Sequence, residues 1–237
     1  MSNKSKFREP WQLVKAVADH ARTLLLYGPP GTGKSFAAHG DGSRPVYSVT
    51  LTPDTPAAEL RGHYVPVGGE FVWRDGPCTR AWREGARLVI NEIDHAGGDA
   101  LSYLLNCLDS SATARITLPS GETVRPADGF QCVATMNGKP DEDLPEALRD
   151  RFPVRVEITE PHPAGVDSLP PDLREAARAT VCSPDPERRI TLRAWLDFAK
   201  LRALAGEEAA AYAVFRHRAE DVMQSFKIAV SATDANS

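Results

Sequence analysis

Short apolar runs separated by polar and glycine-rich segments characterise the chain up to about residue 158. Each run has the length of a β-strand, and Thr23–Tyr27 is continuously apolar, which is typical of a parallel strand buried on both faces. The predicted strands are residues 23–27, 45–51, 87–91, 130–136 and 154–158.

The segments between these strands repeat apolar residues at helical spacing. Residues 10–22 place Val14, Val17 and Ala21 on one face of a helix, and residues 100–108 do the same with leucines. Strands that alternate with amphipathic helices favour an α/β domain. We therefore expect a three-layer α/β/α core with a mostly parallel, five-stranded sheet.

Two segments interrupt this alternation with the pattern of β-hairpins. In residues 63–74 and in residues 115–124, strand-like residues flank a turn that contains glycine. Such hairpins would project from the core and not belong to its sheet. The core is predicted over residues 1–159, with the two hairpins inserted.

The remainder of the chain has the pattern of a small helical domain. Residues 160–171 are rich in proline and predict an irregular linker. Residues 172–237 predict an all-α lid, in which the small polar residues after Val230 are expected to fray. Its helices are predicted at 173–181, 191–205 and 207–222, the second with an apolar stripe of Leu192, Trp195, Leu196 and Ala199.

The composition is that of an ordinary folded protein, with 42% hydrophobic and 25% charged residues. The balance of 28 basic and 32 acidic residues gives no general attraction for nucleic acid or anionic lipid. No apolar window reaches the roughly 20 residues that cross a bilayer, and the polar segment Met1–Arg8 lacks the apolar core of a secretory signal. We expect a cytoplasmic protein with free thiols at Cys78, Cys107, Cys132 and Cys182.

The strongest chemical signal is GPPGTGKS at residues 28–35, which fits the P-loop pattern and lies between a predicted strand and a predicted helix. Gly31 and Gly33 let successive backbone amides point at a β-phosphate, and a helix beginning near Lys34 adds its positive dipole end. Lys34 would reach the β- and γ-phosphates, and Ser35 would ligate magnesium. The predicted ATP-binding residues are Gly28, Pro29, Pro30, Gly31, Thr32, Gly33, Lys34, Ser35 and Phe36.

A second signal is RLVINEID at residues 87–94, an apolar strand that ends in acidic residues. Glu92 at its tip is the natural general base, which would polarise a water in line with the γ-phosphate. His95 follows, but no second histidine stands at ligand spacing, so we predict no transition-metal site.

Together with four further segments, these motifs resemble the AAA+ ATPases, particularly the MoxR and dynein-related branch that includes CbbQ-like activators and GvpN-like proteins. The resemblance extends over about residues 11–206. It implies a P-loop NTPase fold, ATP and Mg²⁺ as cofactors, and ATP hydrolysis. The further segments resemble the helix-2 insert (59–85), the sensor 1 strand (GFQCVATMN, 129–137), the arginine-finger segment (LPEALRDRF, 144–152) and the sensor 2 helix (188–206).

The resemblance also implies roles for single residues. Asn137 would be sensor 1, which holds the attacking water or the γ-phosphate. Arg151, with Arg149 as the close alternative, would be the finger directed at the ATP of a neighbouring subunit. Arg189, or else Arg188, would be sensor 2, which joins the lid to the phosphates. Because a finger acts in trans, we expect a nearly inactive monomer and a homo-oligomer, as a hexameric ring or an open helical assembly.

One residue departs from the family pattern. An aspartate usually precedes the catalytic glutamate and holds the water shell of magnesium, whereas this chain has Asn91. A carboxamide accepts a hydrogen bond but removes one negative charge beside the cation. We therefore hypothesise weaker magnesium binding and slower turnover, with ATP binding retained. Asp94, three residues further on, is expected to face away.

The leading functional hypothesis is an ATPase that remodels or activates a separate client protein. Relatives of the MoxR type act on partners with a von Willebrand A domain, so such a client is one option, and no membrane partner is expected. The aromatic residues of the first hairpin would either grip the client or only pair across the strands. They are His63, Tyr64, Phe71 and Trp73.

Three alternatives belong to other functional classes. Asn91 favours a nucleotide-gated scaffold that hydrolyses little ATP. A motor directed at nucleic acid is compatible with Arg115 and Arg125 near the second hairpin. A small-molecule kinase fits the arginine-bearing segments poorly, since kinases of that group need no trans arginine.

Overall fold

The structure is a computed structural model that describes residues 9–224. By their internal contacts the residues divide into two units. The α/β unit comprises the chain up to Gly28 together with Lys34–Glu157, and the helical unit comprises the chain from Ile158 onward together with the P-loop residues Pro29–Gly33.

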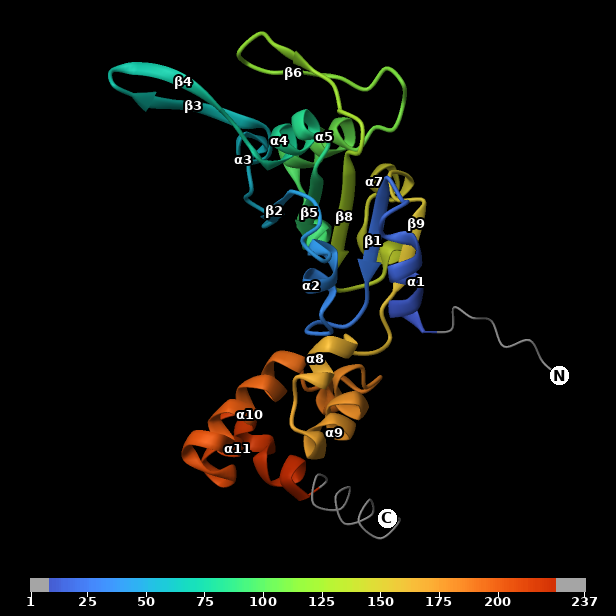
Figure 1. Ribbon diagram of the computed structural model, residues 1–237, viewed down its shortest axis with the longest axis vertical. Coiled ribbons are helices and arrows are strands. Elements are labelled where there is room, and N and C mark those ends of the chain that lie inside the picture. Colours follow the sequence, from blue (N-terminus) through green and yellow to red (C-terminus); the bar gives the residue numbers. More distant parts are fainter. Residues whose placement is uncertain (1–8, 225–237) are drawn as a thin grey trace, which may run out of the picture. The chain divides into compact units, whose positions relative to one another are not determined.

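A five-stranded parallel sheet forms the centre of the α/β unit (Figure 1). Its order is β2 (Val46–Thr50), β5 (Arg87–Asn91), β8 (Gln131–Met136), β1 (Thr23–Tyr27) and β9 (Val154–Glu157). All neighbouring strands pair in parallel. The five predicted strands are confirmed to within one residue at each end.

The place of each strand in the sheet explains its hydrophobic pattern. The central strands β5, β8 and β1 are buried along almost their whole length, whereas the edge strands β2 and β9 are partly exposed. A central parallel strand has layers on both faces, so it is apolar throughout.

Helices cover both faces of this sheet. The connection from β1 to β2 crosses the sheet in the direction opposite to the connections from β2 to β5, β5 to β8 and β8 to β9. Because parallel crossovers are right-handed, the helix of the first connection lies on one face and those of the other connections lie on the opposite face. The first is α2 (Lys34–His39), and the others are α3 (Ala57–Arg61), α4 (Pro77–Glu84), η1 (Ile93–His95), α5 (Gly98–Cys107), α6 (Pro140–Asp143) and α7 (Glu146–Asp150).

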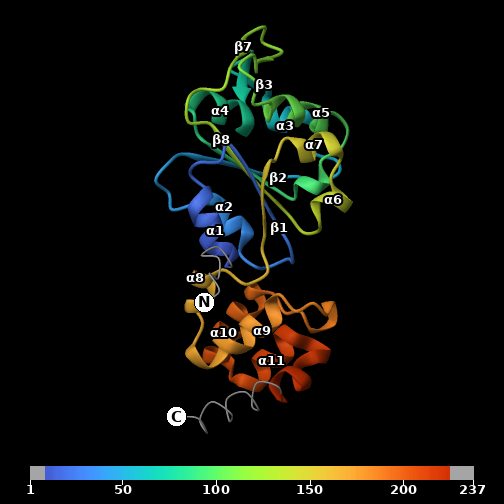
Figure 2. The same cartoon turned by 90° about the vertical axis from the view of Figure 1, so that its right-hand side faces the viewer.

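Both predicted hairpins are present. β3 (Gly62–Val67) pairs antiparallel with β4 (Glu70–Asp75), and β6 (Ile116–Thr117) pairs antiparallel with β7 (Thr123–Val124). Figures 1 and 2 show both hairpins at the same end of the α/β unit. The predicted helix over residues 10–22 is shorter than expected, because α1 spans only Pro10–Val17.

The helical unit contains α8 (Pro163–Asp167), α9 (Pro171–Val181), η2 (Pro186–Arg188), α10 (Leu192–Ala205), α11 (Glu207–Phe215) and η3 (Arg216–Arg218). Trp195, Phe198 and Phe215 form its aromatic core, with ring centroids 5.0 to 6.0 Å apart. None of the helices in the described part of the chain is long and apolar enough to cross a membrane.

Two predictions for this unit are wrong in part. Residues 163–167 form a helix inside the predicted irregular linker, because Pro163 and Pro171 begin helices at a position where their missing N–H donor costs nothing. The predicted helix over residues 207–222 is interrupted at Arg216, whose φ is +54°. The expectations for Met1–Arg8 and for the residues after Val230 lie outside the described residues.

The sequence predicts that all four cysteines are free thiols. The four thiols are free, and those of Cys78, Cys107 and Cys132 are buried. Burial in apolar surroundings raises the pKa of Cys132, so this thiol is protonated at neutral pH.

Candidate nucleotide site

The glycines of the P-loop adopt backbone angles that other residues rarely adopt. Gly28, Gly31 and Gly33 have φ values of +131°, +71° and +101°. A Cβ at Gly31 would lie 2.4 Å from Cβ of Thr191, and a Cβ at Gly33 would lie 2.6 Å from Cβ of His162. Both the left-handed conformation and this close approach require glycine.

Lys34 is 6% exposed and its ammonium group donates hydrogen bonds within the α/β unit. Its Nζ donates to the carbonyl of Gly28 at 2.8 Å and to Oδ1 of Asn137 at 3.1 Å. Asn137 follows the central strand β8, and Lys34 begins α2 after the neighbouring strand β1. The fold therefore joins the P-loop lysine and the predicted sensor 1 residue, which stand far apart in the sequence.

Asn91 ends β5 and is held between the two neighbouring strands. Its amide nitrogen donates to the hydroxyl of Ser48 on β2 at 3.4 Å, and its amide oxygen accepts from the hydroxyl of Thr135 on β8 at 3.2 Å. These contacts fix which end of the carboxamide faces each strand. Sequence reasoning missed both hydroxyls, because only the strand order makes them neighbours.

Glu92 follows β5 in a left-handed conformation, with φ +57° and ψ +49°. For a residue with a Cβ this conformation costs about 1 to 2 kcal/mol, and such strain clusters at active sites. Its Oε2 lies 3.5 Å from Nδ1 of His95, with both side chains partly exposed. The next acidic residue, Asp94, has a buried Oδ1 without a hydrogen-bond partner among the described residues.

Two helix starts of the helical unit contact the P-loop residues that group with it. The amide of His162 donates to the carbonyl of Thr32 at 2.8 Å, and the amide of Leu192 donates to the carbonyl of Gly31 at 3.0 Å. Thr191 caps α10 and packs against Gly31. Burial lowers the pKa of His162, which keeps its imidazole neutral at pH 7. No sequence motif marked these contacts.

The sensor 2 candidates take other positions in the helical unit. Nε of Arg189 donates to the carbonyl of Ser183 at 3.1 Å, and Arg188 lies 3.8 Å from Asp185. The first turn of α10 also carries an arginine that sequence reasoning did not single out. This residue, Arg193, is exposed and directly follows Leu192, the residue hydrogen-bonded to the P-loop.

The two finger candidates are partly exposed and paired within the α/β unit. Arg149 lies 3.2 Å from Asp141, and Arg151 lies 3.5 Å from Asp150 and donates to the carbonyl of Leu105 at 3.3 Å. Arg149 also lines an open surface hollow of about 530 Å³. The hollow is lined by Asp141, Glu146, Ala147, Arg149, Asp150 and Arg155.

The other predicted ligands are spread along the start of α2. Ser35 is exposed, and its carbonyl lies 2.7 Å from Nδ1 of His39. The ring of Phe36 is 66% exposed. Thr32 is buried and its hydroxyl donates to the carbonyl of Pro29 at 3.3 Å.

The donor set of the site suits a hard divalent cation. The two predicted magnesium ligands, the Ser35 hydroxyl and the Asn91 carboxamide, offer neutral oxygens, the atom type that magnesium prefers. Among residues 9–224 no three histidine, cysteine or acidic side chains gather in a group that could hold a metal ion.

Comparison with known proteins gives one family and several relatives. The family model of the AAA domain (dynein-related subfamily) matches residues 23–152. Protein NorQ of Paracoccus denitrificans is 39% identical over 158 residues, which cover 64% of this chain and 58% of NorQ. Uncharacterized protein SH1500 of Staphylococcus haemolyticus is 34% identical over 152 residues, which cover 60% of this chain and 57% of that protein. The chain thus spans less than two thirds of the length of the relatives that it matches.

Proposed function

Because the chain belongs to the dynein-related subfamily of AAA domains, we propose that it binds and hydrolyses ATP and uses the cycle to remodel or activate a partner protein. The observation that carries this proposal is the pair of hydrogen bonds from the buried Lys34 to Gly28 and to Asn137. An ammonium group at the end of a glycine-rich loop, beside a polar amide, is the arrangement that binds the β- and γ-phosphates in P-loop enzymes.

ATP binding uses the backbone as well as the lysine. Phosphate oxygens take the place of the carbonyl and amide oxygens that Lys34 contacts, and the amides of the loop and of the first turn of α2 donate to the phosphates. Ser35 would hold magnesium directly and Asn91 through water, and the ion neutralises charge on the phosphates. Three glycines with positive φ keep the loop in the shape that this requires.

Glu92 and Asn137 perform the hydrolytic step in this proposal. Glu92 accepts a proton from the attacking water, and Asn137 orients that water or the γ-phosphate by hydrogen bonds. The left-handed backbone of Glu92 supports this role, because a strained residue at a strand tip is maintained only by its surroundings. Nδ1 of His95 lies 3.5 Å from this carboxylate, so the two side chains are neighbours in the site.

A neighbouring copy of the chain completes the site. Arg151, or Arg149, would stabilise the charge of the transition state in trans, an effect of roughly 10³ to 10⁵ in rate. We propose a closed hexameric ring or an open helical assembly, since a heterologous interface repeats until it closes. The exposure of both arginines supports a contact with a second subunit.

The helical unit would act as the lid that senses nucleotide. The amides of His162 and Leu192 donate to carbonyls of the P-loop. If residues 31–32 rearrange when nucleotide binds, these hydrogen bonds would move the starts of α8 and α10 with them. Arg189 was the predicted phosphate contact of this unit, and Arg193 is the second candidate because it directly follows Leu192.

A nucleotide-gated scaffold is the second candidate function. It is favoured by Asn91, whose carboxamide is hydrogen-bonded on both sides by strand hydroxyls and carries no charge for magnesium. Sustained hydrolysis by the assembled protein excludes a pure scaffold. Binding of ATP without turnover supports it.

The test compares nucleotide binding by the wild type and by Lys34→Ala, measured by calorimetry with ATP and Mg²⁺. We expect the variant to bind at least about 100-fold more weakly, equivalent to roughly 2.7 kcal/mol. Lys139→Ala is the matched control, because Lys139 is exposed and pairs only locally with Glu142. Failure of the folded wild type to bind ATP, or equal binding by Lys34→Ala, would refute the proposal.

A further inference from the structure

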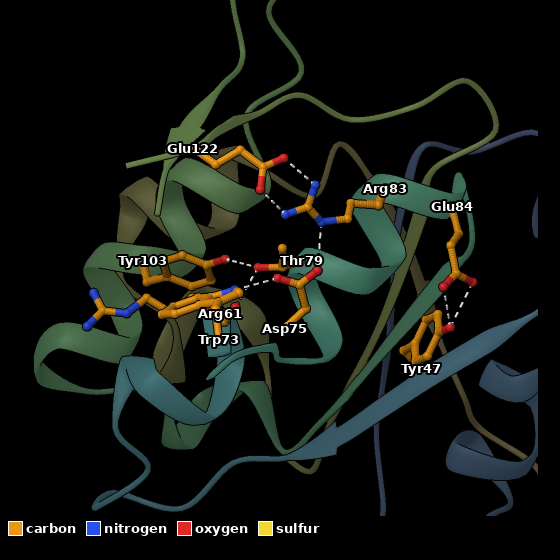
Figure 3. Close-up of polar contacts among 9 residues, drawn as sticks. All are labelled: Tyr47, Arg61, Trp73, Asp75, Thr79, Arg83, Glu84, Tyr103 and Glu122. Carbon is orange, nitrogen blue, oxygen red and sulfur yellow. Dashed lines mark hydrogen bonds and ion pairs between the residues drawn. The ribbon is translucent and has the colours of Figure 1, made fainter. Parts of the chain in front are cut away.

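Arg83 on α4 forms ion pairs with both inserted hairpins (Figure 3). Its Nε lies 2.6 Å from Oδ2 of Asp75, the last residue of β4. Its two terminal nitrogens lie 2.5 and 2.7 Å from the two carboxylate oxygens of Glu122, which directly precedes β7. One guanidinium thus uses three donors on carboxylates from two separate insertions, in the bidentate geometry that gives strong charge-assisted hydrogen bonds.

The root of the β3–β4 hairpin is fixed by further contacts around Asp75. The other oxygen of Asp75 accepts from the indole of Trp73 at 2.6 Å, and the Trp73 ring packs edge-on against Tyr64 with centroids 5.3 Å apart. The hydroxyl of Thr79 on α4 donates to the carbonyl of Arg61 at 2.6 Å. Both ends of the first hairpin therefore contact α4.

The β6–β7 hairpin contacts the same helix. Leu118 and Val124 are buried in the core of the α/β unit, and the amide of Leu118 donates to the carbonyl of Glu122 at 2.8 Å. The neighbouring Arg83 lowers the pKa of Glu122, so this carboxylate stays ionised at neutral pH. Among residues 9–224, the contact of Glu122 with Arg83 is the only ion pair between the β6–β7 hairpin and α4.

α4 is also attached to the central sheet through the residue next to Arg83. Glu84, next to Arg83, accepts from the hydroxyl of Tyr47 on β2 with both carboxylate oxygens at 2.7 Å. Gly85 then ends the helix in a left-handed conformation, and β5 begins at Arg87. Two residues thus separate α4 from the strand that leads to Asn91 and Glu92.

We propose that Arg83 joins the two hairpins into one surface that moves with α4 and hence with the strand that carries the catalytic residues. This surface presents the apolar residues of the first hairpin, since Phe71 is 74% exposed and Tyr64, Val67 and Val72 are also exposed. That the surface contacts a client rests on the proposed function. The mechanical joining of the hairpins is a property of the α/β unit alone.

The experiment measures the distance between the hairpins directly. Spin labels are placed on the chain of residues 1–237 at Glu70→Cys and Ser120→Cys, with the half-buried Cys182 replaced by alanine. The distance distribution is measured by pulsed electron paramagnetic resonance. We expect one narrow distribution for this protein. Arg83→Met, which keeps an unbranched stem but removes the guanidinium, should widen it about twofold, because each hairpin then fluctuates independently.

Two variants control for nonspecific effects. Glu122→Gln removes only the charge of an exposed side chain and should widen the distribution as Arg83→Met does. Arg80→Met removes the same charge from the same helix, but Arg80 lies over the ring of Tyr47 and not at a hairpin, so it should leave the distribution unchanged.

A distribution unaltered in both Arg83→Met and Glu122→Gln, or widened equally by Arg80→Met, would overturn the inference. Calorimetry with ATP on the same samples separates this outcome from failure of the proposed function. If the wild type does not bind ATP, the proposed function is refuted. The distance distributions still decide whether Arg83 joins the hairpins, because they do not depend on nucleotide.

Discussion

Asn91 shows how tertiary neighbours change the meaning of a single residue. In the sequence it is an uncharged residue where an aspartate is usual. In the structure its carboxamide lies between the hydroxyls of Ser48 and Thr135. A hydroxyl either donates or accepts, so both would donate to a carboxylate at this position. The site thus accommodates aspartate without a buried unpaired group.

Asn91→Asp is therefore expected to strengthen magnesium binding and to raise the hydrolysis rate. The added charge should lower the magnesium concentration for half-maximal turnover by roughly three- to tenfold, as expected for a charge added beside a hard cation. Titration of activity with Mg²⁺ measures this. Asn106→Asp on the exposed side of α5 is the control, and an unchanged or higher magnesium requirement for Asn91→Asp contradicts the prediction.

Other residues of the site were predictable because their roles depend on local backbone. The positive φ of Gly28, Gly31 and Gly33 follows from the loop itself, and the sequence already places Lys34 at the start of a helix. The partner of Lys34 was predicted only through the family resemblance, because Asn137 reaches it across two neighbouring strands. The strain at Glu92 and its approach to His95 had no signal in the pattern.

At the scale of elements, strands were predicted better than helices. A buried parallel strand is marked by its own apolar run, whereas the ends of helices depend on caps and on packing. Pro163 and Pro171 start helices in a segment that was predicted to be irregular because of its high proline content. In the helical unit, α9 and α10 are joined by Arg202, which lies 2.6 Å from Asp172.

This ion pair predicts a pH dependence. The hydrogen bond from Arg202 lowers the pKa of Asp172, so the pair stabilises the folded state above the ordinary pKa of aspartate, about 3.9, and that contribution is lost as the pH falls through the lowered value. Asp172→Asn should reduce the free energy of unfolding at pH 7 by about 0.5 to 1 kcal/mol, since the pair is partly exposed.

Urea unfolding followed at several pH values checks this prediction. The difference in unfolding free energy between Asp172→Asn and the wild type should stay constant from pH 7 to about pH 4 and shrink as the pH falls further through the lowered pKa of Asp172. Asp197→Asn removes an exposed carboxylate from α10 and should show a smaller effect at pH 7. A difference that stays constant over the whole pH range would show that the ion pair does not contribute through its charge.

At the scale of the whole molecule, the hydrolytic site is proposed to be shared between subunits. The α/β unit carries both the P-loop lysine and the finger candidates, and Arg149 and Arg151 are held by carboxylates of their own chain. Assembly would have to exchange these partners for a phosphate on a neighbour. In this proposal the activity would depend on protein concentration, because the site is complete only in the assembly.

Mixing two inactive variants tests the shared site. Glu92→Gln keeps the finger and loses the base, and Arg151→Ala keeps the base and loses the finger, so each alone should hydrolyse ATP about 10³-fold more slowly. In an equal mixture about a quarter of the interfaces of a random cyclic assembly combine an intact base with an intact finger, so activity should return.

Steady-state ATPase assays of the mixture give the answer. If Arg149→Ala, and not Arg151→Ala, is inactive alone and regains activity when mixed with Glu92→Gln, the finger is Arg149. Absence of recovery with either variant, in samples that assemble, would contradict a finger acting in trans.

The sequence by itself determined the α/β core, the five strands, the P-loop and the two hairpins, because each depends on periodicity or on backbone requirements within a few residues. Only the tertiary structure decided that Lys34 contacts Asn137, that Ser48 and Thr135 hold Asn91, and that Arg83 joins both hairpins. These contacts connect residues from different strands and insertions. Their existence follows from the order of the strands and the crossing of the chain, which no local pattern of hydrophobic and polar residues specifies.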